Sequence, residues 1–205
     1  MVIKQIGNHR VKHGDVMEGI DDLMDGKKAD IIYTDPPWGQ GNIRYWQTMN
    51  KKMTGAEPTD IPFEKFMLQI FKIGKAHAKN LMFVEFGIRW KDDIIRYGTE
   101  QGFIHNGIIN LQYRSGSKLL PLHLHVFSKT TLDLSTEYID SVTDTHGFDT
   151  LKKAIIPFTK EGKIILDPCC GMGYTAQIAK DTGMVFYGNE LNSKRLEKTI
   201  KRLEK

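Results

Sequence analysis

The stretch Gly162–Glu190, which reads GKIILDPCCGMGYTAQIAKDTGMVFYGNE, decides the fold class of the chain. It contains an apolar run, a loop with Gly171 and Gly173, an amphipathic stretch of helical period, a second apolar run and an acid. Short apolar runs that alternate with amphipathic stretches are typical of an α/β fold with a largely parallel sheet. We therefore predict a strand, a glycine-containing turn, a helix and a second strand in this stretch.

The same alternation continues toward the N-terminus and predicts an α/β fold for the whole chain. Candidate strands lie at Ala29–Thr34, Leu81–Phe86, Ile104–Tyr113, Leu122–Phe127, Lys163–Leu166 and Met184–Gly188. Candidate helices lie at Val16–Met24, Phe63–Ala78, Lys91–Gln101, Thr150–Thr159, Tyr174–Thr182 and Ser193–Leu203. No helical pattern separates the third and fourth strands, so we expect them to form an antiparallel hairpin at one edge of the sheet.

The composition indicates one globular domain. Of its 205 residues, 40% are hydrophobic and 26% are charged, a balance typical of folded rather than disordered chains. No apolar run approaches the roughly 18 residues of a membrane span, and the first residues lack the apolar core of a signal peptide. We therefore expect a cytoplasmic protein with no membrane partner. The net charge of +4 permits a polyanionic partner but does not require one.

The two cysteines, Cys169 and Cys170, are neighbours in the sequence. Adjacent cysteines rarely form a structural disulfide, and no second pair is present to complete a zinc site. We therefore expect two reduced thiols and assign no metal.

Two polar segments fit neither a strand nor a helix pattern. Gly39–Asp60 begins with glycines, and we interpret it as a substrate-side loop, because a loop of this length in a compact domain is usually functional or disordered. Leu132–Gly147 is rich in Asp, Ser and Thr, and we expect it to cross between the two halves of the sheet. No repeat or linker divides the chain, so residues 1–205 are expected to form a single domain.

The glycine loop suits a ligand that contains a nucleoside. Gly171 and Gly173 permit a sharp turn and a close approach of the ligand to the backbone, and the helix N-terminus that follows attracts an anionic group. Glu190 lies 19 residues after Gly171, where an acid accepts hydrogen bonds from both ribose hydroxyls. NAD is the rival ligand, but the full G-x-G-x-x-G pattern is missing because Ala176 replaces its third glycine.

A second motif, IIYTDPPW at Ile31–Trp38, ends an apolar strand with an acid, two prolines and a tryptophan. Strands of open α/β sheets deliver their carboxyl ends to the ligand-binding edge. The prolines stiffen the turn, so that Asp35 and the carbonyl of Pro36 present two acceptors in a set geometry. Such acceptors suit an amine conjugated to a ring, because they localise its lone pair for attack on a sulfonium methyl group. Trp38 offers a surface on which a flipped-out base stacks. A simple surface turn is the alternative.

Together the two motifs resemble the β-class, circularly permuted S-adenosylmethionine-dependent amino-methyltransferases of DNA and RNA. In that family a D/N/S-P-P-Y/F/W tetrapeptide holds the target amine, and a D-P-F-x-G-x-G loop binds S-adenosylmethionine. Here they read DPPW at Asp35–Trp38 and DPCCGMG at Asp167–Gly173, with the tetrapeptide first, as in the β class. The resemblance spans nearly the whole chain and implies a Rossmann-like methyltransferase fold without a separate target-recognition domain.

The resemblance also implies roles for individual residues. The catalytic set is Asp35, Pro36, Pro37 and Trp38. The cofactor-binding set, with Asp15 toward the adenine and Glu190 as the ribose acid, is Asp15, His146, Phe148, Asp167, Pro168, Cys170, Gly171, Gly173, Asn189 and Glu190. Candidate substrate contacts are Arg44, Tyr45, Trp46, Lys51 and Lys52, with Arg114 and Lys118 as further sources of phosphate contacts; a solvated basic loop is the alternative. The sequence departs from the family pattern where Cys169 replaces the loop phenylalanine and where residues 145–149 lack a Lys-Pro pair.

By this resemblance the chain methylates the exocyclic amine of a nucleic-acid base. Aspartate at position 35 favours N6 of adenine in DNA over N4 of cytosine. N6-adenine methylation of RNA and a non-catalytic binding subunit are alternatives, whereas methylation of a protein glutamine would be expected to carry asparagine at position 35. The long loop at residues 39–60, a short target, a homodimer or a partner subunit is expected to supply sequence recognition.

Overall fold

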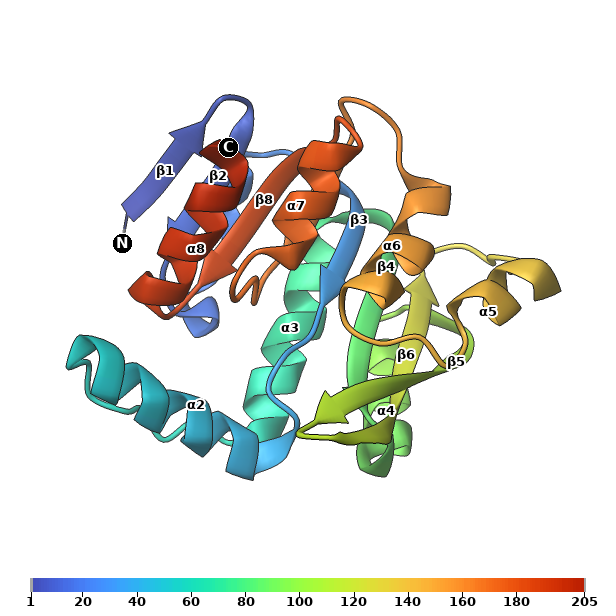
Figure 1. Cartoon of the computed structure of the whole chain (residues 1–205), viewed down its shortest axis with the longest axis horizontal. Coiled ribbons are helices and arrows are strands. Elements are labelled where there is room, and N and C mark those ends of the chain that lie inside the picture. The colour runs from blue at the N-terminus through green and yellow to red at the C-terminus, as the bar shows by residue number, and fades with distance from the viewer. Residues whose placement is uncertain (1, 205) are drawn as a thin grey trace.

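The computed structural model describes residues 2–204, which fold around one eight-stranded sheet (Figure 1). Its strands are β1 (Val2–Ile6), β2 (His9–His13), β3 (Ala29–Thr34), β4 (Ala78–Gly87), β5 (Ile104–Ser115), β6 (Lys118–Ser128), β7 (Ile164–Asp167) and β8 (Val185–Glu190). Across the sheet they follow the order β1-β2-β8-β7-β3-β4-β6-β5. The strands from β2 to β4 in this order run parallel, whereas β1 and the β5–β6 hairpin pair antiparallel. The predicted α/β sheet and its antiparallel edge hairpin are confirmed.

Helices cover both faces of the sheet (Figure 1). Helices α5 (Thr136–Val142), α6 (Phe148–Ile155), α7 (Tyr174–Asp181) and α8 (Ser193–Glu204) pack on one face, and α1 (Asp21–Met24), α3 (Phe63–His77) and α4 (Lys91–Glu100) pack on the other. The central strands are therefore buried on both sides. In β3, Ile31 and Tyr33 contribute to the first core and Ile32 to the second, which explains why the strand reads as an unbroken apolar run.

The two motifs meet where the direction of the chain across the sheet reverses. From β7 the chain passes through α7 to β8 on one side, whereas from β3 it passes through α3 to β4 on the other. These connecting helices lie on opposite faces, so a crevice opens at the carboxyl ends of β3 and β7. Open α/β sheets bind their ligands at such a switch point. Asp35 follows β3 and Asp167 ends β7, so the topology brings both acids to this crevice.

The expectation of a loop at residues 39–60 was wrong. Residues 39–54 form helix α2 (Gly39–Thr54), which runs along the mouth of the crevice (Figure 1). Its buried side chains Ile43, Gln47 and Asn50 recur at helical spacing, but two of the three are polar and therefore give no apolar stripe. The helix ends at Gly55, whose φ of 79° is left-handed, as is common for glycine after a helix.

Three smaller features also differ from the expectations. Strands β1 and β2 form an N-terminal hairpin that extends the sheet beyond β8. The stretch Val16–Met24 is not one helix: a 3-10 turn (Val16–Glu18) is followed by Gly19, at φ 82°, before α1 begins. The polar segment 132–147 contains α5, capped by Ser135, whose hydroxyl accepts from the backbone N–H of Tyr138. None of the helices within residues 2–204 has the length and apolar character needed to span a membrane.

Candidate functional site

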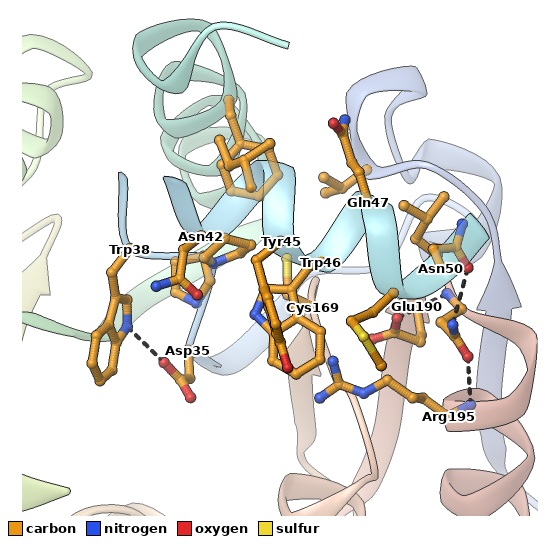
Figure 2. Close-up of a pocket in the computed structure, with 18 of the residues that line it drawn as sticks. Asp35, Trp38, Asn42, Tyr45, Trp46, Gln47, Asn50, Cys169, Glu190 and Arg195 are labelled. Carbon is orange, nitrogen blue, oxygen red and sulfur yellow. Dashed lines mark hydrogen bonds between the residues drawn. The ribbon is translucent and has the colours of Figure 1, made fainter. Parts of the chain in front are cut away.

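A cavity of about 700 Å³ lies at the switch point of the sheet (Figure 2). The tetrapeptide Asp35–Trp38 lines it together with Asp15, Pro168 and Glu190. In Figure 2, Asp35 and Trp38 lie toward one end and Glu190 toward the other, with Cys169 between them. The tetrapeptide and the glycine-loop region, which are far apart in the sequence, therefore face a single space.

The side chain of Asp35 is exposed to this cavity, whereas Pro36, which follows it, is buried. The indole Nε1–H of Trp38 donates a hydrogen bond of 2.9 Å to Oδ1 of Asp35 (Figure 2). The Trp38 ring in turn packs edge-on against Tyr113 of β5, with 5.0 Å between the ring centroids. An ionised carboxylate offers about four lone-pair positions, so Asp35 keeps most of its acceptor capacity for a ligand.

The surrounding protein raises the pKa of Asp35 to about 6, chiefly because the cleft removes water from the charged carboxylate. The hydrogen bond from Trp38 and the positive charge of Arg195 act in the opposite direction and favour the ionised form. The carboxyl group keeps contact with solvent through the cavity, so its protonation can follow the pH of the medium. Asp35 is consequently ionised at neutral pH and becomes protonated as the pH falls below about 6.

The glycine loop between β7 and α7 is tightly packed. Gly171 and Gly173 have left-handed φ angles of 53° and 78°. A Cβ atom on Gly173 would lie 2.8 Å from Cα of Thr199 in α8, a distance that only movement of the backbone would relieve. The backbone N–H of Gly171 points inward and donates a hydrogen bond of 2.8 Å to Oε2 of Glu190. The loop is thus fixed against both α8 and the end of β8.

Glu190 is held by backbone donors on both of its carboxylate oxygens. Oε2 accepts from Gly171, and Oε1 accepts from the backbone N–H of Asn192 at 2.8 Å. The side chain of Asn192 also donates to Oδ1 of Asn50 in α2, at 3.0 Å (Figure 2). A carboxylate with two hydrogen bonds still has free lone pairs. The bonds from Gly171 and Asn192 fix the direction in which Glu190 presents its free lone pairs to the cavity.

Asp167 is likewise held by the chain itself. Its Oδ1 accepts from the backbone N–H of Cys169 at 3.1 Å, and its Oδ2 accepts from the hydroxyl of Thr175 at 2.7 Å. Burial nevertheless raises the pKa of Asp167 to about 7, and the negative charges of Asp35 and Glu190 add to the rise. The carboxyl ends of β7 and β3 therefore concentrate more negative charge than the protein neutralises.

Helix α2 forms the roof of the cavity and is attached to α8. Ile43, Gln47 and Asn50 face inward from α2. The guanidinium of Arg195 in α8 lies over the ring of Trp46 at 4.4 Å from its centroid, an arrangement worth about 0.5–2 kcal/mol. The roof is therefore held by a cation–π contact with α8 and by the hydrogen bond between Asn50 of α2 and Asn192, which directly precedes α8.

The structure places the residues assigned from the sequence in three groups. Those that line the cavity are Asp15, Asp35, Pro36, Pro37, Trp38, Tyr45, Trp46, Pro168, Asn189 and Glu190. Those outside its lining are His146, Phe148, Asp167, Gly171 and Gly173, and Cys170 is buried in the core. Three basic residues of α2 point elsewhere: Arg44 and Lys52 are exposed, and Lys51 pairs with Glu57 at 2.8 Å.

Several cavity residues were missed by the sequence analysis, notably Asn42, Asn50, Met53, Tyr113, Asn192 and Arg195. A helical reading of residues 39–54 would have found the first three, because they follow Trp38 on one side of α2. Arg195 lies in the first turn of α8, and it reaches the cavity only because α8 packs close to α2. Within the described residues 2–204, no group of three or more His, Cys, Asp or Glu side chains is arranged to hold a metal ion.

Residues 143–202, which span the glycine loop and the strands and helices around it, match a family model described as DNA methylase. No curated protein matches the chain. The family match supports an amino-methyltransferase, and it covers the segment that supplies Asp167 and Glu190.

Several solved structures are similar to the chain along nearly its whole length. The complex of M1.HpyAVI with SAM has a TM-score of 0.67 and 18% identity, covering 95% of this chain and 98% of that one. A putative DNA modification methylase from Thermus thermophilus, complexed with S-adenosyl-L-methionine, has a TM-score of 0.62 and 16% identity, with coverages of 95% and 93%. The cytosine-N4-specific PvuII DNA methyltransferase has a TM-score of 0.67 and 13% identity, with coverages of 97% and 87%. These similarities establish the fold.

Proposed function

We propose that this protein is an S-adenosylmethionine-dependent methyltransferase that methylates the exocyclic amine of a nucleic-acid base, with N6 of adenine in DNA as the first candidate. One observation carries the proposal: Asp35–Trp38 and the residues around the glycine loop line the same cavity at the switch point of the sheet. The DNA methylase family match over residues 143–202 and the methyltransferase fold point the same way.

The cavity residues fit S-adenosylmethionine. Glu190 faces the cavity with free lone pairs, as a ribose-binding acid requires. Within residues 2–204, the buried Oδ1 of Asn189 has no hydrogen-bond partner, and this residue also lines the cavity. An unpartnered buried amide oxygen is costly, and an amino or hydroxyl group of a nucleoside would satisfy it. Asp15 and Val16 add an acid and an apolar side chain to the lining.

When bound, S-adenosylmethionine supplies an electrophilic methyl group on a sulfonium. The protein's part is to position and activate the amine. Asp35 accepts a hydrogen bond from one amino hydrogen and the carbonyl of Pro36 accepts one from the other, so that the lone pair of the nitrogen is directed out of conjugation with the ring. Asp35 is the stronger acceptor because it is charged. The nitrogen would gain the methyl group as the methyl–sulfur bond breaks and its electron pair stays on the sulfur, which would become a neutral thioether. The methylated amine would then give up one proton, which the carboxylate of Asp35 would receive.

The target base requires an apolar surface beside these acceptors. Trp38 provides one, and its edge-on contact with Tyr113 fixes the orientation of the ring. Base stacking on an aromatic side chain is worth about 1–3 kcal/mol. A base in duplex DNA has to be flipped out of the helix to reach this depth.

DNA is the proposed partner because the family model and the similar structures are those of DNA methylases. Adenine is placed first because aspartate stands at position 35, and cytosine N4 is retained because the PvuII enzyme has the same fold. Residues 1–205 are proposed to act as a single domain, so target recognition would come from a short site, a second copy of this chain or a partner subunit.

The test is to incubate the protein with S-adenosylmethionine labelled in its methyl group and with duplex DNA, single-stranded DNA, RNA or protein. Each acceptor is digested and the labelled product identified by mass. We expect the DNA digest to yield labelled N6-methyldeoxyadenosine. N4-methylcytosine, or label in RNA alone, would correct the base or the nucleic acid. Cofactor binding without label in any acceptor would contradict the enzymatic proposal and support a binding subunit.

A further inference from the structure

A further carboxylate, that of Glu85, stands near Asp35 and Asp167, and neither sequence motif includes it. Strands β3 and β4 are parallel with Tyr33 opposite Phe83 and Thr34 opposite Val84. The next pair along is therefore Asp35 and Glu85. Side chains of a strand alternate between faces, so Glu85 shares its face with Phe83, on the side of the sheet to which Tyr33 and Asp35 belong.

A buried phenol holds Glu85 in this position. The hydroxyl of Tyr33, a residue only 2% exposed, donates a short hydrogen bond to Oε2 of Glu85. Asp167 of β7 lies on the other side of Tyr33, since Leu166 is in register with Ile32. The row Asp167, Tyr33, Glu85 thus joins the ends of three neighbouring strands, next to Asp35, which lines the cavity.

The charges that act on Glu85 are negative. Burial raises its pKa to about 8, and the charges of Asp35 and Asp167 add to the rise, while the hydrogen bond from Tyr33 opposes it. From β6 the residue opposite Glu85 is Leu124, which is apolar. The cation that acts on this group of acids is Arg195, through Asp35. Three carboxylates in a partly dehydrated site with one guanidinium form an environment that favours a further positive charge.

We propose that Glu85, held by Tyr33, acts with Asp35 and Asp167 to distinguish the positively charged cofactor S-adenosylmethionine from its neutral thioether product S-adenosylhomocysteine. This inference rests on the proposed function. Loss of the methyl group removes the sulfonium charge, so the product lacks the attraction that the acids offer to the substrate form. The preference follows from Coulomb's law for a cation in the cavity next to these acids, and for a partly hydrated site we expect roughly a threefold to tenfold difference in affinity.

The same arrangement makes cofactor binding depend on pH. Because the pKa of Glu85 is raised to about 8, this carboxyl is mostly protonated in the free protein at neutral pH. A cation bound nearby favours the ionised form and lowers that pKa, so binding releases a proton. Affinity for S-adenosylmethionine therefore rises as the pH increases toward 8 and levels off above it. The neutral product lacks the sulfonium, so its affinity changes less over the same range.

The experiment measures the dissociation constants of S-adenosylmethionine and S-adenosylhomocysteine by calorimetry at pH 6.5, 7.5 and 8.5, with no acceptor present. The wild-type protein is compared with Glu85→Gln and, as a matched control, with Glu137→Gln, which removes an exposed acid of α5. We expect the wild type and the control to prefer S-adenosylmethionine increasingly as the pH rises. Glu85→Gln should lose roughly a threefold to tenfold share of that preference. Its ratio should change less between pH 7.5 and 8.5 than that of the wild type, and the change that remains at lower pH belongs to Asp167, whose pKa is about 7.

A second variant covers the case in which Glu85→Gln fails to fold. Tyr33→Phe keeps the ring and removes the hydroxyl that stabilises ionised Glu85, so it should move the pH dependence of the ratio to higher pH. A ratio and pH dependence equal to those of the wild type in either folded variant would overturn the inference. If the wild type binds neither compound, the proposed function itself fails. If it binds both with a ratio independent of pH, only the role of Glu85 fails.

Discussion

The carboxylates at the two ends of the cavity differ in how many hydrogen bonds they accept from the protein. At the glycine-loop end, Glu190 and Asp167 each accept two hydrogen bonds from donors of the chain itself. At the tetrapeptide end, Asp35 accepts one hydrogen bond, from Trp38, and otherwise faces the cavity. The first end is fixed by folding and the second keeps its acceptor capacity for a ligand. We therefore expect changes at the first end to affect stability most and changes at the second to affect turnover most.

The largest expected effect is that of Asp35→Asn on methyl transfer. The amide keeps the shape of the side chain but loses its charge, and losses of one strong electrostatic contact to a transition state reduce kcat by about 100-fold to 1000-fold. Affinity for S-adenosylmethionine should decrease by no more than about tenfold, because Asp35 is one of the acids proposed to attract the sulfonium, so the loss of turnover should exceed the loss of binding. Because the pKa of Asp35 is raised, its ionised form opposes folding above pH 6, so Tm should be unchanged or higher.

Labelled methyl transfer, cofactor titration and thermal unfolding measure these three quantities. Asp133→Asn, at an exposed position outside the cavity lining, is the matched control. Turnover of Asp35→Asn within a few-fold of the control would remove Asp35 from the proposed mechanism. It would also contradict the expectation that changes at the tetrapeptide end affect turnover most.

The opposite end is tested by Thr175→Val, which removes the hydroxyl that donates to buried Asp167. Loss of a donor to a buried charged group costs about 1.5–3 kcal/mol. The pKa of Asp167 is about 7, so the carboxyl is ionised at pH 8 and largely protonated at pH 6. The decrease in the free energy of unfolding should therefore be larger at pH 8. Urea denaturation at both pH values measures it.

Thr182→Val is the control for this experiment, because the hydroxyl of Thr182 bonds to a backbone carbonyl of its own helix and faces no carboxylate. An equal loss of stability in both variants, or a loss that does not change with pH, would mean that the hydrogen bond to Asp167 contributes no more than an ordinary one.

The pH dependence of kcat/KM tests the exposed acid directly. The proposed role of Asp35, to accept a hydrogen bond and then a proton from the amine, requires its ionised form. The pKa of Asp35 in the free protein is about 6. With S-adenosylmethionine saturating, kcat/KM for the nucleic-acid acceptor should therefore be level above pH 7 and decrease by up to about tenfold per pH unit below 6. Initial rates between pH 5 and 8.5 measure this limb, and the residual activity of Asp35→Asn should lack it. A limb that persists in that variant would belong to another group.

The smallest effect is expected from Trp38→Phe, which keeps an aromatic surface and removes the indole N–H. That donor lowers the pKa of Asp35, so its loss should move the acid limb upward, by at most about one pH unit for a hydrogen bond of ordinary strength. Rates at pH 8 should change little if stacking is preserved. A limb at the wild-type position would show that the hydrogen bond from Trp38 leaves the affinity of Asp35 for protons unchanged.

The sequence carried enough information for the sheet and for both motifs, because these depend on local patterns. Strands such as Ala29–Thr34 are buried on both faces and read as apolar runs, and Gly171 and Gly173 mark their turn by residue type alone. Helix α2 was mistaken for a loop because its inward positions are partly polar: Gln47 and Asn50 face a cavity and not a core. An apolar pattern detects packing against a core, and it fails where a helix covers a ligand site.

Contacts between distant segments were beyond the sequence for a different reason. Glu85 lies in a strand that reads LMFVEF, where one acid within an apolar run gives no motif. Its place beside Asp35 follows from the register of two strands, and its bond to Tyr33 follows from that register. Arg195 likewise reaches Trp46 only because α8 packs near α2. Such pairs depend on the order of strands and helices in space, which no local pattern encodes.

Asn192 has a further consequence. Its backbone N–H holds Glu190, and its side chain holds Asn50 of α2. The helix that covers the cavity and Glu190, the acid proposed to bind ribose, are therefore held by the same residue. If α2 lifts, it pulls on the residue that steadies Glu190, and a nucleoside anchored on Glu190 steadies α2 in return. We therefore expect a substitution at Asn192 to change both how readily a ligand enters the cavity and how tightly it is retained.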